Sequence, residues 1–567
     1  MTSEKRRDKA RGRLAWVATA AIGASILLTI GIGLLGPSPM VPGLTGPSRH
    51  PPYSLDVHPE PHLVIALAAA ALVLGGLGLL TALALLRPPA HDAASWNLSD
   101  SSPPDGQTRG GPISDAPVSP AASTSTIRAR HASAQLTRGH EDAGKGVPHW
   151  LRSLPSARTL VLLGCLTAAI LAFLPPSGSG DHLNYAAYGR MVTLGLDPYS
   201  HGAVDLPGDP IADAVEQPWR EEPSVYGPVA TALQAVASWV GGDSLRLTIF
   251  VLALFNAAAF IATGLLIDRF TRDDPARRLR AALLWTANPL LLYHLVAGLH
   301  VDTFAIACMV AALLARGRPV GSGVLFGLGV AIKVNAGLAA LGPAWELRRR
   351  PARLALMAAC AVAVVVVGYA VVGPDAIAPI TRTSKSISHA SLWKLVQGWL
   401  QSLVGTGSAY RGEIQVGSLL VLALVAWSLL RLSSRSRAAS GLGAGGVCGD
   451  RGLEAPVVAA ALVVAYVFAT PYILPWYDGL ALGALALVAG SAVDGFVVAH
   501  LLVLSLAYLP ARVDGQPEDL EWLRTVLRPQ LAWALVALTV ALILWAWRAA
   551  ARERRPPVSA ARRPSAP

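Results

Sequence analysis

The chain is short of charged side chains, which make up only 14% of its 567 residues, whereas soluble domains carry about a quarter. The 53% of residues that are hydrophobic gather in runs of about 20, the length of a helix that crosses a bilayer. Sustained strand alternation is missing, which argues against a membrane β-barrel. These deficits exclude an ordinary soluble domain and predict an all-α integral membrane protein.

Cysteine is also scarce, with four residues in the whole chain. Cys165, Cys308 and Cys360 lie inside apolar runs, and Cys448 lies in a Gly/Arg-rich segment that we predict to be cytosolic. No two of them have the spacing of a metal site, and the pattern does not support a disulfide framework. The first three are expected to serve as small apolar residues.

Nucleotide-binding motifs are missing as well. The sequence has no P-loop and no GxGxxG after a strand, and the GLGAGG segment near residue 441 lies in the predicted cytosolic loop. We also find no cytosolic Asp-x-Asp domain of the kind that uses a nucleotide-sugar. The net charge of +12 comes mostly from Lys and Arg in short stretches between apolar runs, as the positive-inside rule describes. Nucleic-acid binding is therefore not expected.

The apolar runs and the basic segments between them predict a multi-pass protein of the plasma membrane. Basic residues before the first run and after the last place both termini in the cytosol. Residues 228–240 are too short to span and are expected to lie along the surface. The short runs 319–333 and 335–347 are either two spans or a re-entrant pair. About 14 spans satisfy the rule, at about residues 14–36, 62–87, 157–175, 245–268, 280–297, 302–316, 319–333, 335–347, 353–373, 416–431, 455–470, 478–492, 494–510 and 528–548.

Composition divides the chain into four parts. Residues 1–87 form a predicted two-helix extension. Residues 88–156 are rich in Ser, Pro, Gly, Asp and Arg, which is typical of a disordered linker, here on the cytosolic side. Residues 157–548 form the main membrane domain, and residues 549–567 form a basic cytosolic tail.

The segment 181–228 is a polar, acidic and aromatic loop on the predicted external side. Asp181 and His182 follow an apolar helix closely, which holds a carboxylate near the water–lipid boundary, where a lipid-borne substrate presents its headgroup. A carboxylate there can remove a proton from an attacking sugar hydroxyl, or orient that hydroxyl or a cation. The alternative is that the aspartate only ends the helix.

Aromatic residues accompany this carboxylate. Tyr185 and Tyr188 lie on one helix face, Tyr226 precedes a Gly-Pro bend, and Trp476 and Tyr477 follow a proline at a helix start. Each can stack on a sugar ring or anchor the chain in the interfacial belt, and the sequence leaves both roles open. Together with these aromatic residues, His182 is expected to contact the acceptor sugar.

Two charged motifs lie near predicted helix ends. His300 and Asp302 mark the outer tip of a hairpin and can bind a metal or the phosphate end of a donor, although two ligands do not make a metal site. A divalent cation therefore stays open and its ligands unknown. Lys333 interrupts an apolar stretch and can either neutralise the phosphate of a lipid carrier or snorkel to the surface.

A basic segment on the predicted external side runs against the charge rule. Arg382 and Lys385 precede His389, Trp393 and Lys394 in the loop at about residues 374–415. An anionic ligand, either a phosphate or a lipid headgroup, explains a cationic cluster on that side. A solvated loop is the alternative.

Six segments taken in order carry a family resemblance: DHLNYAAYG, GLDPYSHG, PSVYGP, ANPLLLYHLVAGLHVD, AIKVNAG and PWYDGLALG. Together they resemble the actinobacterial polyprenol-phosphate-mannose-dependent α-1,6-mannosyltransferases of the GT-C superfamily, over about residues 157–548. The resemblance implies a GT-C-like helical bundle, a lipid-phosphate sugar donor and transfer with inversion. It also implies a mannan or lipoglycan acceptor, such as lipomannan or lipoarabinomannan, and a catalytic role for Asp181 on the external face.

Other functions remain open beside this resemblance. The same site can transfer another sugar, such as arabinose, from a similar carrier. A transporter or flippase for lipid-linked sugars would need a path lined by charges, and the apolar runs are nearly free of them. A non-catalytic scaffold for cell-wall assembly is the remaining alternative.

Overall fold

The computed structural model describes residues 3–87, 154–383, 385–439, 454–512 and 514–552. Within these ranges the chain forms helices and no strand, apart from one isolated bridge between Ser38 and Val41. The predicted all-α class is confirmed for the described part. The GLGAGG segment and Cys448 lie outside the described residues, as do nearly all of the predicted linker and most of the basic tail.

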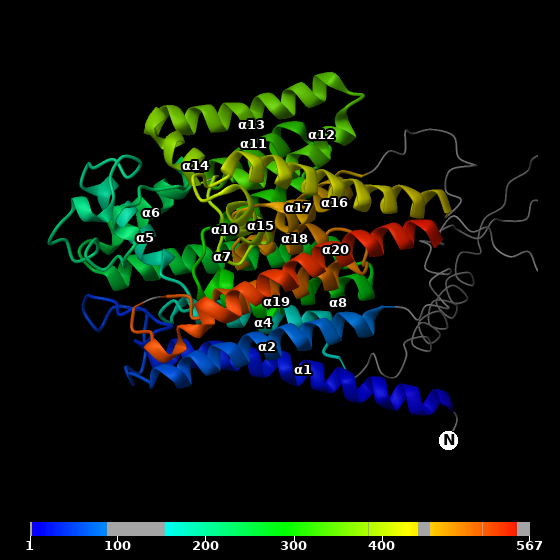
Figure 1. The fold of residues 1–567 in the computed structure, drawn as a ribbon, viewed down its shortest axis with the longest axis horizontal. Coiled ribbons are helices and arrows are strands. Elements are labelled where there is room, and N and C mark those ends of the chain that lie inside the picture. Colours follow the sequence, from blue (N-terminus) through cyan, green and yellow to red (C-terminus); the bar gives the residue numbers. More distant parts are fainter. Residues whose placement is uncertain (1–2, 88–153, 384, 440–453, 513, 553–567) are drawn as a thin grey trace, which may run out of the picture.

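Six described helices are long and apolar enough to cross a membrane, and they run roughly along the long axis of the molecule (Figure 1). They lie in α1 (Ser3–Leu35), α2 (Pro61–Leu86), α7 (Leu245–Thr271), α13 (Pro351–Val372), α16 (Arg411–Ala439) and α20 (Arg528–Arg552). Five apolar helices are shorter: α4 (Ala157–Ala172), α10 (Asp302–Leu314), α11 (Pro319–Ile332), α17 (Ala455–Ala469) and α19 (Val493–Tyr508). The expected number of about 14 spans stays a prediction.

The run 280–297 is not the continuous helix that its hydrophobicity predicts. It is divided into α8 (Pro275–Leu284), α9 (Pro289–Leu291) and a π-helical turn, η4 (Leu292–Ala297). Pro289 has no backbone N–H to donate, and the side chain of Asn288 instead accepts the N–H groups of Leu290 and Leu291 and caps a new helix. The helix expected at 478–492 is shorter as well: the observed helix there is α18 (Asp478–Leu485).

The two segments expected as large loops contain short helices. Residues 181–228 include α5 (Asp181–Thr193), η2 (Ala203–Asp205) and η3 (Trp219–Glu221), and α6 (Pro228–Gly241) follows them. Residues 374–415 include η6 (Pro374–Ala376), α14 (Ile377–Thr383) and α15 (Leu392–Val404). The remaining short elements are η5 (Val334–Ala340), α12 (Leu341–Leu347), η7 (Pro475–Tyr477), η8 (Glu518–Leu520) and η9 (Leu523–Leu527).

The N-terminal pair α1 and α2 packs closely against the rest of the bundle. A Cβ atom on Gly75 would lie 2.9 Å from the ring of Pro289 on α9, and one on Gly76 would lie 2.7 Å from the side chain of Leu502 on α19. Glycine at these positions lets the helix backbones approach, as is common between helices in membranes. The two helices therefore pack as part of the bundle.

The hairpin of α10 and α11 positions two charged residues at one end of the bundle. Asp302 is the first residue of α10, and Lys333 directly follows the last residue of α11. Because α10 leaves this end and α11 returns to it, residues far apart in the sequence meet there. The segment between α5 and α6 lies at the end of the molecule opposite the start of α1 (Figure 1).

Candidate active site

Most of the predicted site residues come together at this end of the bundle. Hydrogen bonds, ion pairs and ring contacts join them into one group, here called the Asp181 cluster. Its members come from five separate segments of the chain: Asp181, Tyr185, Tyr226, His300, Asp302, Lys333, Trp476 and Tyr477.

Asp181 opens α5, so its carboxylate stands at the positive end of the helix dipole. Its backbone N–H donates to Oγ of Ser179, and Oδ2 accepts from the hydroxyl of Tyr185 one turn later at 3.5 Å. A quarter (25%) of the side chain is exposed. Burial raises the pKa of Asp181 to about 6, while the ammonium of Lys333 opposes the shift. Such a carboxylate is suited to take a proton near neutral pH.

Lys333 does not stand free in the cluster. Its Nζ lies 2.7 Å and 2.8 Å from the two carboxylate oxygens of Asp302, which is 1% exposed. The ammonium also lies over the ring of Tyr477, 4.2 Å from its centroid, and 5.9 Å from that of Tyr226. The charge of Asp302 therefore neutralises that of Lys333. Ionised Asp181 then gives the cluster a net negative charge.

His300 lies in a tightly held turn between η4 and α10. Nδ1 lies 2.6 Å from the carbonyl oxygen of His294, and the ring stacks on Trp476 with centroids 3.6 Å apart. Asn256 on α7 donates to the carbonyl oxygen of His300, and Leu299 adopts a positive φ of 53° in the same turn. A non-glycine residue in this conformation is strained, so the turn is held by its surroundings. Burial lowers the pKa of His300 well below its ordinary value.

Tyr226 joins the end of the 181–228 loop to the end of α11. Its hydroxyl donates to that of Tyr185 at 3.4 Å, and the two rings meet edge to face. The next residue, Gly227, donates its N–H to the carbonyl oxygen of Ile332. A Cβ atom there would lie 2.3 Å from the carbonyl oxygen of Ala331, so this approach requires glycine.

The other two predicted residues of α5 lie apart from the cluster contacts. Tyr188 donates to the carbonyl oxygen of Glu222 and so ties the loop to α5. His182 is fully buried, and neither of its ring nitrogens bonds to another described residue. Burial lowers the pKa of His182 to about 3, so the ring is neutral. The predicted contact of either side chain with a sugar stays a prediction.

Arg382 lies in α14 and Lys385 two residues after the end of that helix, and both side chains are exposed. The segment that follows them is anchored at Ser388, whose N–H donates to the carbonyl oxygen of Pro471. The Ser388 hydroxyl donates to the carbonyl oxygen of Ile473 and accepts the N–H of the same residue. The basic segment is therefore fixed to the loop that leads into η7, which carries the two aromatic residues of the cluster.

Several supporting residues escaped the sequence-based prediction. Asn256 interrupts the apolar α7, and a polar residue within a span is a signal of function that could have been followed. Arg512 lies on the predicted external side, pairs with Glu216 and donates to the carbonyl oxygen of Ser38. Ser179 gave no signal in the sequence, because its role depends only on where the chain turns.

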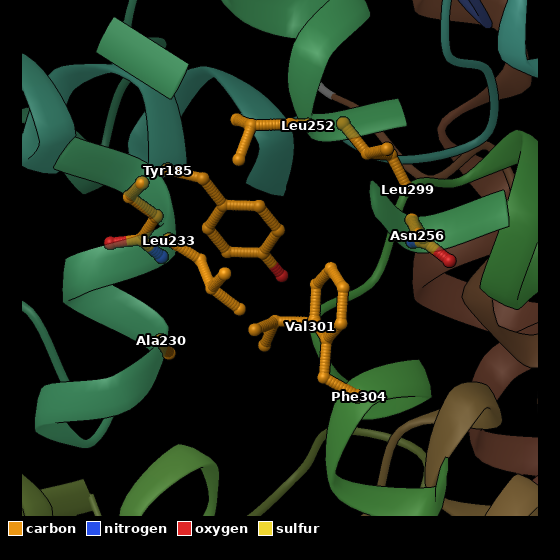
Figure 2. Close-up of a pocket in the computed structure, with 9 residues that line it drawn as sticks. Tyr185, Ala230, Leu233, Leu252, Asn256, Leu299, Val301 and Phe304 are labelled. Carbon is orange, nitrogen blue, oxygen red and sulfur yellow. The ribbon is translucent and has the colours of Figure 1, made fainter. Parts of the chain in front are cut away.

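A small hollow adjoins the cluster (Figure 2). The ring of Tyr185 stands among its lining residues, and most of the other lining side chains are apolar. Besides Tyr185, the lining residues are Ala230, Leu233, Gln234, Leu252, Asn256, Leu299, Val301 and Phe304, of which only Gln234 and Asn256 are polar. In the described part of the chain, no group of three or more His, Cys, Asp or Glu residues could hold a metal ion, so the metal question stays open.

The segment of the chain that matches a known protein family contains most of this cluster. Residues 134–349 match the N-terminal domain of the alpha-(1->6)-mannopyranosyltransferase family. This segment includes every member of the Asp181 cluster except the two aromatic residues of η7. The predicted resemblance to α-1,6-mannosyltransferases is confirmed.

Individual relatives agree with the family match. The chain is 29% identical over 171 residues to alpha-(1->6)-mannopyranosyltransferase A of Corynebacterium glutamicum, covering 30% of this chain and 35% of the relative. It is 29% identical over 189 residues to the A enzyme of Mycobacterium tuberculosis, covering 32% and 35%. A probable alpha-(1->6)-mannopyranosyltransferase of Mycolicibacterium smegmatis is 32% identical over 146 residues, covering 25% and 26%. The matches thus span about a third of these relatives or less, and no solved structure matches the chain.

Proposed function

We propose that the protein is a membrane mannosyltransferase that moves mannose from polyprenyl-phosphate-mannose to an α-1,6-mannan or lipoglycan acceptor on the external face. The observation that carries the proposal is the carboxylate of Asp181, partly exposed at a helix start among aromatic rings. It lies inside the segment that matches the α-1,6-mannosyltransferase family. A GT-C-like bundle of about 14 spans with cytosolic termini completes the proposal.

The chemistry is a single displacement at C1 of the mannose. The acceptor hydroxyl lies against Asp181, which takes its proton as the oxygen attacks C1. The bond from C1 to the phosphate oxygen breaks, and its electron pair leaves with the polyprenyl phosphate. Attack from the face opposite the leaving group inverts the configuration, so a β-linked donor gives an α-linked product.

The structure bears on which cations meet the leaving phosphate. Lys333 is already paired with Asp302, and its ammonium lies over the ring of Tyr477. Because the Asp302 carboxylate balances its charge, Lys333 attracts an anionic ligand only weakly. The exposed Arg382 and Lys385 carry no such partner among the described residues, and their segment is fixed to the loop before η7. In the proposed mechanism these two cations stabilise the leaving phosphate, and Lys333 holds Asp302 at the sugar.

The proposal is tested by transfer of radiolabelled mannose in membranes that contain the protein. Synthetic polyprenyl-phosphate-mannose and a short α-1,6-mannoside serve as donor and acceptor, and Asp181→Asn is the matched variant. Wild type is expected to lengthen the acceptor and the variant to give no product, with equal amounts of both proteins in the membrane. Transfer by Asp181→Asn at the wild-type rate would refute the role of Asp181. A parallel assay with a polyprenyl-phosphate-arabinose donor separates the two sugars.

A further inference from the structure

His300 faces Asp181 with one ring nitrogen. Nε2 lies 3.7 Å from Oδ2 of Asp181, while Nδ1 lies 2.6 Å from the carbonyl oxygen of His294. Because a carbonyl oxygen only accepts hydrogen bonds, Nδ1 carries the proton. In a neutral imidazole Nε2 is then an acceptor without a proton. It therefore presents a lone pair to a carboxylate oxygen, which is also an acceptor.

The surroundings fix this orientation of the ring. His300 is fully buried, its ring is stacked on Trp476, and its carbonyl oxygen accepts from Asn256 and from the hydroxyl of Thr303. Turning Nε2 away from Asp181 would break the bond at Nδ1. Burial also keeps the ring neutral, because it lowers the pKa of His300 well below the ordinary value.

The geometry suits a protonated Asp181 better than an ionised one. Two acceptors cannot form a hydrogen bond, and 3.7 Å is too long for one. Once Asp181 carries a proton, its O–H can donate to Nε2 of His300. Tyr185 acts in the opposite sense, because its hydroxyl donates to Oδ2 and favours the carboxylate.

We propose that His300 is a positioning residue that accepts a hydrogen bond from Asp181 once Asp181 has taken the proton of the acceptor hydroxyl. Its catalytic meaning rests on the proposed function, whereas the hydrogen bond is a property of the chain alone. The acceptor oxygen bonds to C1, its proton moves to Oδ2, and the electron pair of the broken C1–O bond leaves with the phosphate. His300 keeps its own proton at Nδ1 and takes no second one. A contact that forms only as the proton moves lowers the barrier.

Other titratable groups surround this pair and act on it through space. Lys333 and Asp302 oppose one another, because they form an ion pair. The remaining groups are tyrosines and histidines: Tyr185, Tyr188, Tyr226, Tyr472, Tyr477, Tyr508, His182 and His294. The test therefore changes His300 alone and leaves this surrounding charge in place.

The test is an infrared titration of Asp181 in the full-length protein in bilayer discs. The carbonyl band of the protonated carboxyl is assigned by subtracting the spectrum of Asp181→Asn. His300→Met is close in size but removes the strong acceptor, and it is expected to lower the pKa of Asp181 by about one unit, the worth of one hydrogen bond. Thr303→Val is the matched control, since it removes a hydrogen bond in the same turn without touching Nε2. An unchanged or raised pKa in His300→Met would overturn the proposal, as would an equal fall in Thr303→Val.

Mannose transfer gives a second readout. His300→Met is expected to lower kcat about tenfold and to leave KM for the donor unchanged, because the contact acts on the proton transfer and not on binding. A selective rise in KM would contradict the proposal. If wild type transfers no mannose, the proposed function fails, and the infrared titration still decides whether His300 accepts from Asp181.

Discussion

Asp181 has a raised pKa, and its carboxylate is still partly exposed to solvent. The sign of the pH dependence follows. Above pH 6 the group is mostly ionised and can take a proton, whereas below its pKa of about 6 it is mostly protonated and cannot. His300 stays neutral across this range, because burial lowers its pKa.

We therefore expect mannose transfer to lose rate as the pH falls through about 6. Below that point kcat/KM should drop about tenfold per pH unit, as for any single essential base. Initial rates measured between about pH 5 and 8 check this. Each preparation is then returned to neutral pH and assayed again, to confirm that any loss of rate is reversible. A rate that stays level to pH 5 would show that Asp181 is not the base.

Lys333 and Asp302 form the buried ion pair of the cluster, with exposed side-chain fractions of 14% and 1%. Replacing Lys333 by Met leaves an unpaired buried carboxylate, which should cost about 3–5 kcal/mol of stability. The double replacement Lys333→Met with Asp302→Leu should cost less than the two single changes together. Thermal unfolding in one detergent measures all three variants, and strictly additive losses would contradict the pairing.

At the level of elements, the loop before α6 meets the end of α11 backbone to backbone. Gly227→Ala places a Cβ atom 2.3 Å from the carbonyl oxygen of Ala331, so the contact must open and move Tyr226 and Lys333. We expect mannose transfer to fall at least about tenfold with unchanged helix content by circular dichroism.

The matched control for this change lies on α11 itself. Gly321 has no neighbouring atom within 4 Å of a Cβ position, and alanine favours a helix over glycine by about 1 kcal/mol. Gly321→Ala should therefore keep full activity and gain slightly in stability. Equal activity of the two variants would show that the Gly227 contact does not position the site.

The helices also contain buried charges that bear on the transporter alternative. Arg280 on α8 pairs with Asp494 on α19 at 2.6 Å, and the carboxylate of Asp478 lies 2.8 Å from Nδ1 of His500. The apolar runs are thus less free of charge than the sequence suggests at first reading. Each charge has a partner within the bundle, which suits helix packing better than a path for a charged substrate.

At the scale of the whole molecule, α5, which begins at Asp181, and the start of α1 lie at opposite ends (Figure 1). Single cysteines at Val204 and Asp273, both exposed, test the predicted sidedness after the four native cysteines are replaced. A membrane-impermeant maleimide added to intact cells should label Val204→Cys and should label Asp273→Cys only after lysis. The reverse result would invert the proposed topology.

Helix formation and membrane insertion follow from composition, because apolar length alone decides whether a segment can cross a bilayer. Asp181 was identifiable because it lies within a few residues of the end of an apolar run. The Asn288–Pro289 break was also written in the sequence, since proline cannot continue the hydrogen bonding of a helix. The hydrophobicity of residues 280–297 nevertheless led to the prediction of one continuous helix.

The sequence by itself determined that this protein is helical and apolar, and it supplied the candidate carboxylate and the resemblance to mannosyltransferases. Only the tertiary structure decided which candidates meet. Lys333 pairs with Asp302 because the α10–α11 hairpin returns to the same end, and His300 stacks on Trp476, which lies far along the chain. Such contacts depend on how helices pack, and local patterns carry no record of packing.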